Sequence, residues 1–291
     1  MNHLKSLSFI RRSFLLIGLS VLLPAVLSAQ SYRELSERAV QATEHDSLQL
    51  AETLLREALK LEPANPHNAL LFSNLGTIQR RQKKYEQALE SYNYALNIAP
   101  RTVPILLNRA TLYLELGKND AARADYSLVL DADPDHAEAL LMRAYIYMQH
   151  RDYAWARADY NRLLKANPTD FKARLGLATL AQKEGKLEEA FGILNRLVQA
   201  EAESTHPDAH QLSLLYVARA GVEKDLKHID LALLDLEEAL RLNPSQAEAY
   251  LMRGQIYLTQ GKRRLAKDDL TQAMALGVPQ AEIRDLWKQC K

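Results

Sequence analysis

The hydrophobic positions of this chain recur three and four residues apart, which is the spacing of one helix face. Leu106, Ala110 and Tyr113 follow this spacing, and after a polar break a second apolar-patterned stretch begins near Ala121. Prolines follow such stretches at Pro63, Pro100, Pro134, Pro168 and Pro244. Because proline cannot continue a helix and moves the preceding residue out of helical angles, each should end a helix pair. The pattern therefore predicts an all-α chain of helix–turn–helix units.

These helix pairs repeat with a period of 34 residues. The segment "LLNRATLYLELGKNDAARADY" at 106–126 returns in altered form as "LLMRAYIYMQHRDYAWARADY" at 140–160 and as "YLMRGQIYLTQGKRRLAKDDL" at 250–270. A fixed period of this length is typical of repeat proteins, in which each unit buries its apolar face against the next.

The repeat resembles the tetratricopeptide repeat family over about nine-tenths of the chain. In that family, small residues lie where the two helices of a pair touch, and a large residue four places later fills the gap to the neighbouring unit. The small residues here are Gly76, Ala110, Ala144, Ala178, Ala220 and Gly254 on first helices, and Ala51, Ala88, Ala122, Ala156, Ala190, Ala232 and Ala266 on second helices. The large residues are Leu55, Tyr92, Tyr126, Tyr160, Leu194, Leu236 and Leu270. The resemblance implies a right-handed α-solenoid of about seven repeats.

The predicted repeats are residues 32–65, 69–102, 103–136, 137–170, 171–204, 213–246 and 247–280. The first is degenerate, because it lacks the aromatic and glycine positions of the others. An insertion at 205–212 should produce a distortion or a longer loop near His206 to His210. Residues 281–291 are predicted to form a capping helix that covers the open end of the array and buries Cys290.

Residues 1–29 are predicted to be a secretory signal peptide. Basic residues precede an apolar run at 14–27, and Ala29 would be the last residue before cleavage. The run is shorter than the roughly twenty residues that a spanning helix needs, although an uncleaved membrane anchor is the alternative. We therefore expect a periplasmic or secreted protein.

The net charge indicates which partners are expected, and the cysteine content indicates how the fold is held together. Removing residues 1–29 removes three of the 37 Lys and Arg residues and none of the 36 acidic ones, which leaves a formal net charge of −2. A nearly neutral chain gives no electrostatic reason to bind nucleic acid or anionic lipid, so membrane contact is expected only through an uncleaved signal sequence or a complex. The single cysteine, Cys290, cannot form an internal disulfide, so packing alone must hold the fold.

Four repeats carry an Arg at the seventh position and an Asp sixteen residues later: Arg109 with Asp125, Arg143 with Asp159, Arg219 with Asp235, and Arg253 with Asp269. Where Leu75 or Leu177 replaces the Arg, the acid is also absent; the first repeat breaks the rule, with Arg38 and no acid. Joint presence and loss favours a structural ion pair, because a partly buried Arg needs a hydrogen-bonding carboxylate. The alternative is a ladder of charges that grips a partner.

The resemblance implies that the first helices line a concave groove that binds peptides or protein surfaces. The groove residues would be Asn74, Thr77, Arg80, Arg81, Asn108, Thr111, Leu114, Met142, Tyr145, Met148, Thr179 and Lys183. The groove should be basic at the second repeat and apolar in the middle. Asn side chains can bind a peptide backbone, and Met surfaces adapt to varied apolar groups. Alternatively, some of these residues only coat a solvated groove.

We find no catalytic constellation in the sequence. His206 and His210 are four residues apart, but the Glu of the HExxH motif is missing, which favours a solvated loop over a metal site. We therefore predict a non-catalytic interaction scaffold that binds protein or peptide partners, with no cofactor and no small-molecule substrate. The alternatives are a permanent structural subunit of a cell-envelope or secretion complex and, less favoured, a metal-binding protein.

Overall fold

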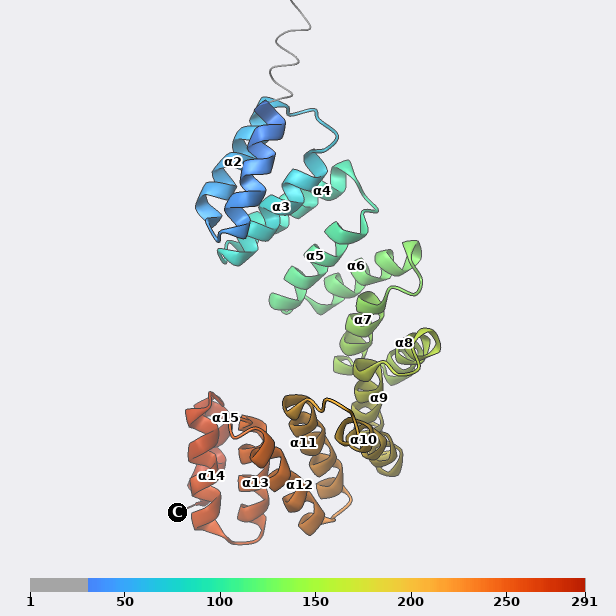
Figure 1. The fold of residues 1–291 in the computed structure, drawn as a ribbon, viewed down its shortest axis with the longest axis vertical. Helices are drawn as coiled ribbons and strands as arrows, with labels where there is room; N and C mark the ends of the chain where they lie inside the picture. The colour runs from blue at the N-terminus through green and yellow to red at the C-terminus, as the bar shows by residue number, and fades with distance from the viewer. Residues whose placement is uncertain (1–30, 291) are drawn as a thin grey trace, which may run out of the picture. The chain divides into compact units, whose positions relative to one another are not determined.

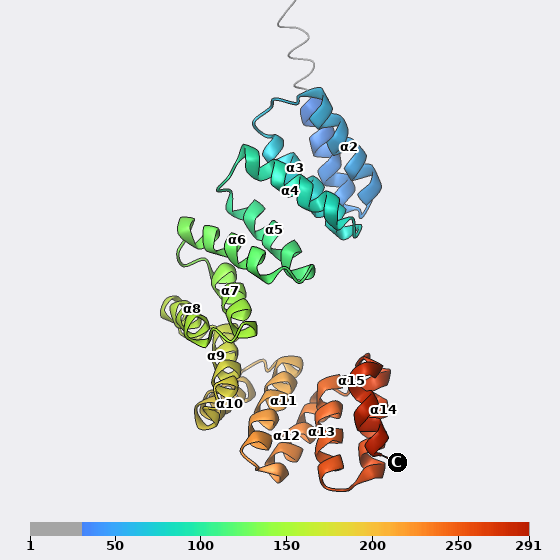
Figure 2. The ribbon, with the colours of Figure 1, turned by 180° about the vertical axis from the view of Figure 1, so that it is seen from behind.

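The computed structural model describes residues 31–290, and the predicted signal peptide lies outside this range. The described chain is helical throughout, without a strand, and consecutive helices fold back on one another as pairs (Figures 1 and 2). A helix over residues 31–44 is followed by α2 (Leu48–Leu61), α3 (Asn68–Arg81), α4 (Tyr85–Ile98), α5 (Val103–Glu115), α6 (Asn119–Ala132), α7 (Ala137–Gln149), α8 (Tyr153–Ala166), α9 (Phe171–Lys183), α10 (Leu187–Ala202), α11 (Ala209–Asp225), α12 (Ile229–Leu242), α13 (Ala247–Thr259), α14 (Arg263–Ala275) and α15 (Gln280–Gln289). The predicted all-α fold class is confirmed. Among these helices, none has the length and apolar character needed to cross a bilayer.

The helices form two compact units that divide after Ala139. In the first unit, each of the helices α2 to α6 packs against the next, and α3 also contacts α5. In the second unit, each of the helices α8 to α15 packs against the next, and α13 contacts both α11 and α15. Within a unit, the first helices of neighbouring repeats therefore share one layer. This is the packing of stacked hairpins.

The second helices end where the prolines predicted. The residue before each proline has φ between −132° and −137° and ψ between 72° and 93°, outside the helical region. These residues are Glu62, Ala99, Asp133, Asn167 and Asn243. Steric contact with the proline ring disfavours helical angles at this position, so the stop signal is local and readable from the sequence.

The turn inside each hairpin contains one residue with a left-handed backbone. In three hairpins this residue is a glycine, Gly117, Gly185 or Gly261, with φ between 68° and 75°. In the other four it is Asp46, Lys83, Arg151 or Lys227, with φ between 56° and 69°. Residues other than glycine adopt these angles at a cost, so glycine is the residue expected at such a turn. A search for glycine would nevertheless find only three of these seven turns.

The residues assigned to helix contacts form the core. All seven small residues predicted on the second helices are fully buried, and the seven large residues four places later are at most 3% exposed. Small residues let the helix backbones approach, and the large ones fill the space that remains. This part of the prediction is confirmed.

The junction between α10 and α11 differs from the expected insertion at 205–212. The loop is shorter, because α11 begins at Ala209 rather than near residue 213. The Asp208 carboxylate accepts hydrogen bonds from the backbone N–H groups of His210 and Gln211 at 2.8 and 3.2 Å. Asp208 is thus an N-cap that starts the helix early.

The last helix, α15, packs onto α14 at the end of the second unit. Ile283 is fully buried in a cluster with Leu270 and Ala273 of α14. Cys290 is only half-buried, because it follows the last residue of α15, and the prediction of a buried cysteine is therefore wrong. Burial nevertheless raises the pKa of its thiol, which disfavours the reactive thiolate.

Candidate functional site

The four Arg–Asp pairs lie inside the stack and join the two helices of one repeat. In each pair, Arg Nε and Nη2 donate to the two carboxylate oxygens of the Asp at 2.7 to 2.8 Å. The acids, Asp125, Asp159, Asp235 and Asp269, are buried. Bidentate geometry of this kind gives strong, charge-assisted hydrogen bonds.

Arg109 and Arg219 also reach the preceding repeat. Arg109 Nη1 donates to Asn93 Oδ1 on α4 at 2.7 Å, and its guanidinium lies 5.7 Å from the Tyr113 ring centroid. Arg219 makes the equivalent contact with Asn195 on α10 at 2.7 Å. A guanidinium engaged on two helices and an aromatic ring has little capacity left for a partner. The geometry therefore favours the structural interpretation, while the contribution of the pairs to stability stays a prediction.

Where a repeat lacks the Arg–Asp pair, a different ion pair crosses its junction. Glu52 on α2 is 5% exposed and accepts from Lys84 Nζ and Arg56 Nη2, both at 2.9 Å. Arg157 on α8 pairs with Glu184 and with Glu189, the latter at 2.7 Å. Each bridge joins the preceding repeat to a repeat that carries Leu75 or Leu177 in place of the Arg. The sequence analysis missed them, although Glu52 and Arg157 share the twenty-first position of their repeats.

The Glu52 bridge should make stability depend on pH. Burial raises the pKa of Glu52, but hydrogen bonds from Lys84 and Arg56 outweigh burial and hold it below the ordinary value of 4.5. Because the folded pKa is the lower one, the ionised bridge stabilises the fold above pH 4.5, and this contribution is lost as the pH falls. Replacing Glu52 by Gln should remove about 1 to 2 kcal/mol at neutral pH and little in acid.

Thermal unfolding at neutral pH and about one unit below pH 4.5 tests this expectation. Glu57→Gln is the matched control, because Glu57 is exposed on the same helix. The wild type and the control should lose more stability on acidification than Glu52→Gln. Equal losses in all three proteins would contradict the role assigned to the bridge.

In the first unit, the predicted groove residues differ in what they can offer a partner. Asn74 on α3 is exposed. The Thr77 hydroxyl lies 3.0 Å from the buried Tyr92 hydroxyl, Thr111 is hydrogen-bonded to Tyr126, and Asn108 Nδ2 donates to Ser73 Oγ at 3.5 Å. The two threonines are therefore hydrogen-bonded to the second helices of their own repeats, whereas the Asn74 amide is free to bind a partner.

The expected basic character of the second repeat is wrong. Arg80 pairs with Glu115 at 3.0 Å, and Arg81 pairs with Asp46 at 2.7 Å. Each acid lies on a neighbouring repeat, 35 residues away in the sequence. The arginines therefore carry compensated charge and do not make this end of the surface basic.

In the second unit, the predicted groove residues of α7 separate into exposed and buried ones. Tyr145 is 48% exposed, and Met142 is half-buried. Met148 is 6% exposed, and its sulfur accepts a hydrogen bond from the Tyr160 hydroxyl at 3.2 Å. Met148 therefore faces the second helix of its own pair, and its assignment to the groove is wrong. On α9, Thr179 is half-buried and Lys183 is exposed.

The two histidines of the less favoured metal hypothesis do not share a helix. His206 lies in the loop before α11, and His210 lies in the first turn of α11. His210 Nδ1 is 3.2 Å from Asn243 Nδ2. Across residues 31–290, no group of three or more His, Cys, Asp or Glu side chains is placed to hold a metal ion. The helical spacing that suggested a site is therefore not realised.

Helical hairpins that stack side by side at a fixed period of about 34 residues define a helical repeat protein. Tetratricopeptide repeat models match residues 69–102, 107–170, 141–205 and 218–274. A solved tetratricopeptide repeat protein from Parabacteroides merdae ATCC 43184 is 36% identical to this chain, with a TM-score of 0.79, and the match covers 90% of this chain and 99% of that one. The chain belongs to the tetratricopeptide repeat family. No curated protein sequence matches it.

Two more distant solved structures share the fold. The APC/C hetero-tetramer Cut9-Hcn1 is 16% identical with a TM-score of 0.62, covering 89% of this chain and 52% of its own. The Pseudomonas aeruginosa protein pilF is 16% identical with a TM-score of 0.59, covering 78% of this chain and 99% of its own. Identities this low indicate a common fold and carry no functional assignment.

Proposed function

We propose that this protein is a non-catalytic interaction scaffold that holds a protein or peptide partner on the layer of its first helices. Tetratricopeptide repeat proteins are generally non-enzymatic scaffolds that bind such partners. The observation that carries the proposal is that the first helices of each unit present side chains that the fold does not use. Asn74 is exposed on α3, and Tyr145 is 48% exposed on α7, while the half-buried Arg and buried Asp side chains of the four pairs bind one another.

The mechanism would be passive. Side chains on packed helices are already ordered, so the entropic cost of ordering the surface when a partner binds is small. A few anchors then supply most of the binding energy, and tyrosine is among the residues that most often do so. Tyr145 is the strongest anchor of this kind in the second unit.

Export is part of the proposal and rests on the sequence of residues 1–29. The basic start, the short apolar run and the small residue at Ala29 support cleavage by a signal peptidase. Mass spectrometry of the protein purified from its cells should find a mature chain that begins at Gln30. An intact N-terminus would instead support the membrane-anchored alternative.

A permanent structural subunit is the second candidate function, because the second helices expose large apolar side chains. In the second unit, Trp155 on α8 is 65% exposed, and Leu231 and Leu234 on α12 are 50% and 57% exposed. Leu231 and Leu234 lie one turn apart on α12, and neighbouring exposed apolar side chains often mark a protein contact. A subunit that uses this outer layer would stay in a large assembly during purification.

Affinity capture from envelope extracts distinguishes the two candidates. One variant carries Asn108→Asp and Tyr145→Asp on first helices, and the matched variant carries Leu231→Asp and Leu234→Asp on a second helix, so that each adds two negative charges. If the first layer binds, the first variant should lose about 90% or more of the captured partner, as expected for loss of an anchor, and the second should keep it. The opposite result would support the subunit, and retention by both variants would contradict both candidates.

A further inference from the structure

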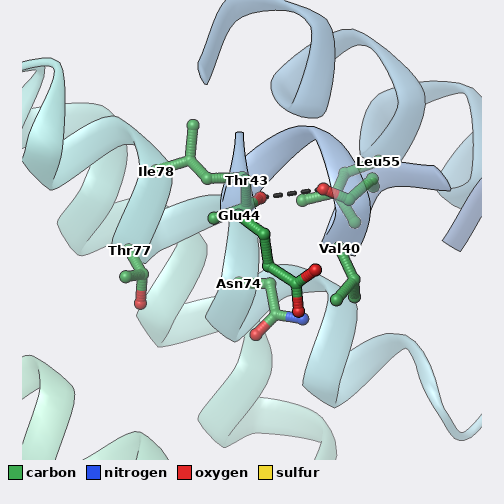
Figure 3. A pocket seen from close by; sticks show the side chains of 8 residues that line it. Val40, Thr43, Glu44, Leu55, Asn74, Thr77 and Ile78 are labelled. Carbon is green, nitrogen blue, oxygen red and sulfur yellow. Dashed lines mark hydrogen bonds between the residues drawn. The ribbon is translucent and has the colours of Figure 1, made fainter. Parts of the chain in front are cut away.

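The first unit contains an open pocket between the helix over 31–44 and α3 (Figure 3). Its empty volume is about 490 Å³, including space open to solvent. Leu55 and Ile78 are almost fully buried beneath it, and Val40 lines it although 48% of Val40 is exposed. An apolar hollow of this kind, with a partly exposed branched side chain in its wall, is suited to receive an apolar group.

The polar side chains that line the pocket differ in their free hydrogen-bonding capacity. The Thr43 hydroxyl donates to the Ala39 carbonyl at 2.8 Å, and the Thr77 hydroxyl bonds to the Ser73 carbonyl and to Tyr92. Both threonines are therefore engaged within the fold. Glu44 and Asn74 form no hydrogen bond or ion pair with any residue that the structure describes.

In Figure 3, the Glu44 and Asn74 side chains extend toward each other from the two helices. Glu44 is the only charged side chain among the described residues that line the pocket. The nearby Arg81 pairs with Asp46 at 2.7 Å, so it does not compensate this carboxylate. The mouth of the pocket therefore combines one uncompensated negative charge with one amide that can both donate and accept.

We propose that this pocket binds a partner segment in which a branched or aromatic apolar residue stands next to a Lys or Arg. The apolar side chain fills the hollow over Leu55 and Ile78, and the cation pairs with Glu44. Asn74 bonds the backbone of the residue that fills the hollow: its amide oxygen accepts from that residue's N–H, and its NH₂ donates to that residue's C=O. This inference rests on the proposed scaffold function and adds that the partner segment is positively charged. Arg80 and Arg81 do not indicate the partner's charge, because acidic residues of the protein already compensate them.

Selection from a phage-displayed library of random heptapeptides tests the pocket. The full chain is compared with Glu44→Lys, Glu57→Lys and Val40→Asp. Glu57 is exposed on α2 and is not among the pocket residues, so the two lysine variants change the net charge equally. The wild type and Glu57→Lys should enrich peptides with an apolar residue beside Lys or Arg. Glu44→Lys should enrich the same apolar residue beside Asp or Glu, and Val40→Asp should lose the enrichment.

A synthetic peptide from the wild-type pool gives the affinities. It should bind Glu44→Lys about tenfold more weakly than wild type, and Glu57→Lys within about twofold, as expected for reversal of one exposed ion pair. Circular dichroism and the unfolding temperature of each variant confirm that it folds.

Three outcomes would overturn the pocket proposal: no enriched peptide, acidic peptides enriched by the wild type, or identical pools for the two lysine variants. The capture experiment with Asn108→Asp and Tyr145→Asp does not use the pocket residues. If those substitutions still abolish partner capture, the scaffold function stands and only the pocket proposal fails.

Discussion

Replacing Asp125 by Leu should lower the free energy of unfolding by about 3 kcal/mol, the cost of removing one member of a buried ion pair. Asp125 is 2% exposed and binds both Nε and Nη2 of Arg109. Without the carboxylate, Arg109 keeps its charge in a half-buried site, beside the Asn93 amide oxygen and the face of the Tyr113 ring, neither of which carries a negative charge. The loss therefore comes mainly from an uncompensated charge.

Replacing both members, with Arg109→Met and Asp125→Leu, should bring stability back to within about 1 kcal/mol of wild type, because no unpaired charge remains. The same order is expected for Asp159→Leu compared with the double replacement of Arg143 and Asp159. Urea unfolding should be combined with hydrogen exchange of α5 and α6, since repeat arrays can unfold in parts. Equal losses in the single and double variants would show that the two charges are not coupled.

The features that sequence predicted well are those that depend on residues within one repeat. The proline stops act through local backbone sterics, and the Arg–Asp pairs follow from a fixed separation of sixteen residues between two helices of one hairpin. The small residues Ala88 and Ala122 are buried because a helix pair closes at the same place in every repeat. Local rules of this kind apply before any long-range contact is known.

The features that sequence missed depend on neighbouring repeats or on small helix rotations. The resemblance places both Tyr145 and Met148 in the groove, yet Tyr145 is 48% exposed and Met148 is 6% exposed. Arg80 and Arg81 were expected to be available, but their acidic partners stand 35 residues away. A search for opposite charges about one repeat length apart in the sequence would have found those partners. The burial of Met148 could not be predicted in this way, because it depends on where the Tyr160 side chain lies in the folded repeat.

Replacing Gly176 by Ala should destabilise the protein by about 2 kcal/mol, although alanine favours a helix by about 1 kcal/mol over glycine. A Cβ at this position would lie 2.4 and 2.5 Å from Cε1 and Cζ of Tyr160. Tyr160 is 3% exposed, and burial raises its pKa to about 12, so its hydroxyl stays protonated and donates to Met148. The ring cannot withdraw without breaking that bond and displacing its buried neighbours.

Gly192→Ala is the matched control for this substitution, because Gly192 lies in α10 of the same repeat. A Cβ there would meet only Arg196 Nη1, at 3.7 Å, so the control should gain about 1 kcal/mol of stability from helix propensity. Adding Tyr160→Leu to Gly176→Ala should recover part of the loss, since later repeats carry Leu at this position and the shorter side chain leaves room for the methyl group. If Gly176→Ala proved as stable as Gly192→Ala in urea unfolding, the close approach of α9 to Tyr160 would not be a constraint on the fold. The paired substitutions therefore measure directly how tightly one repeat is fitted to the next.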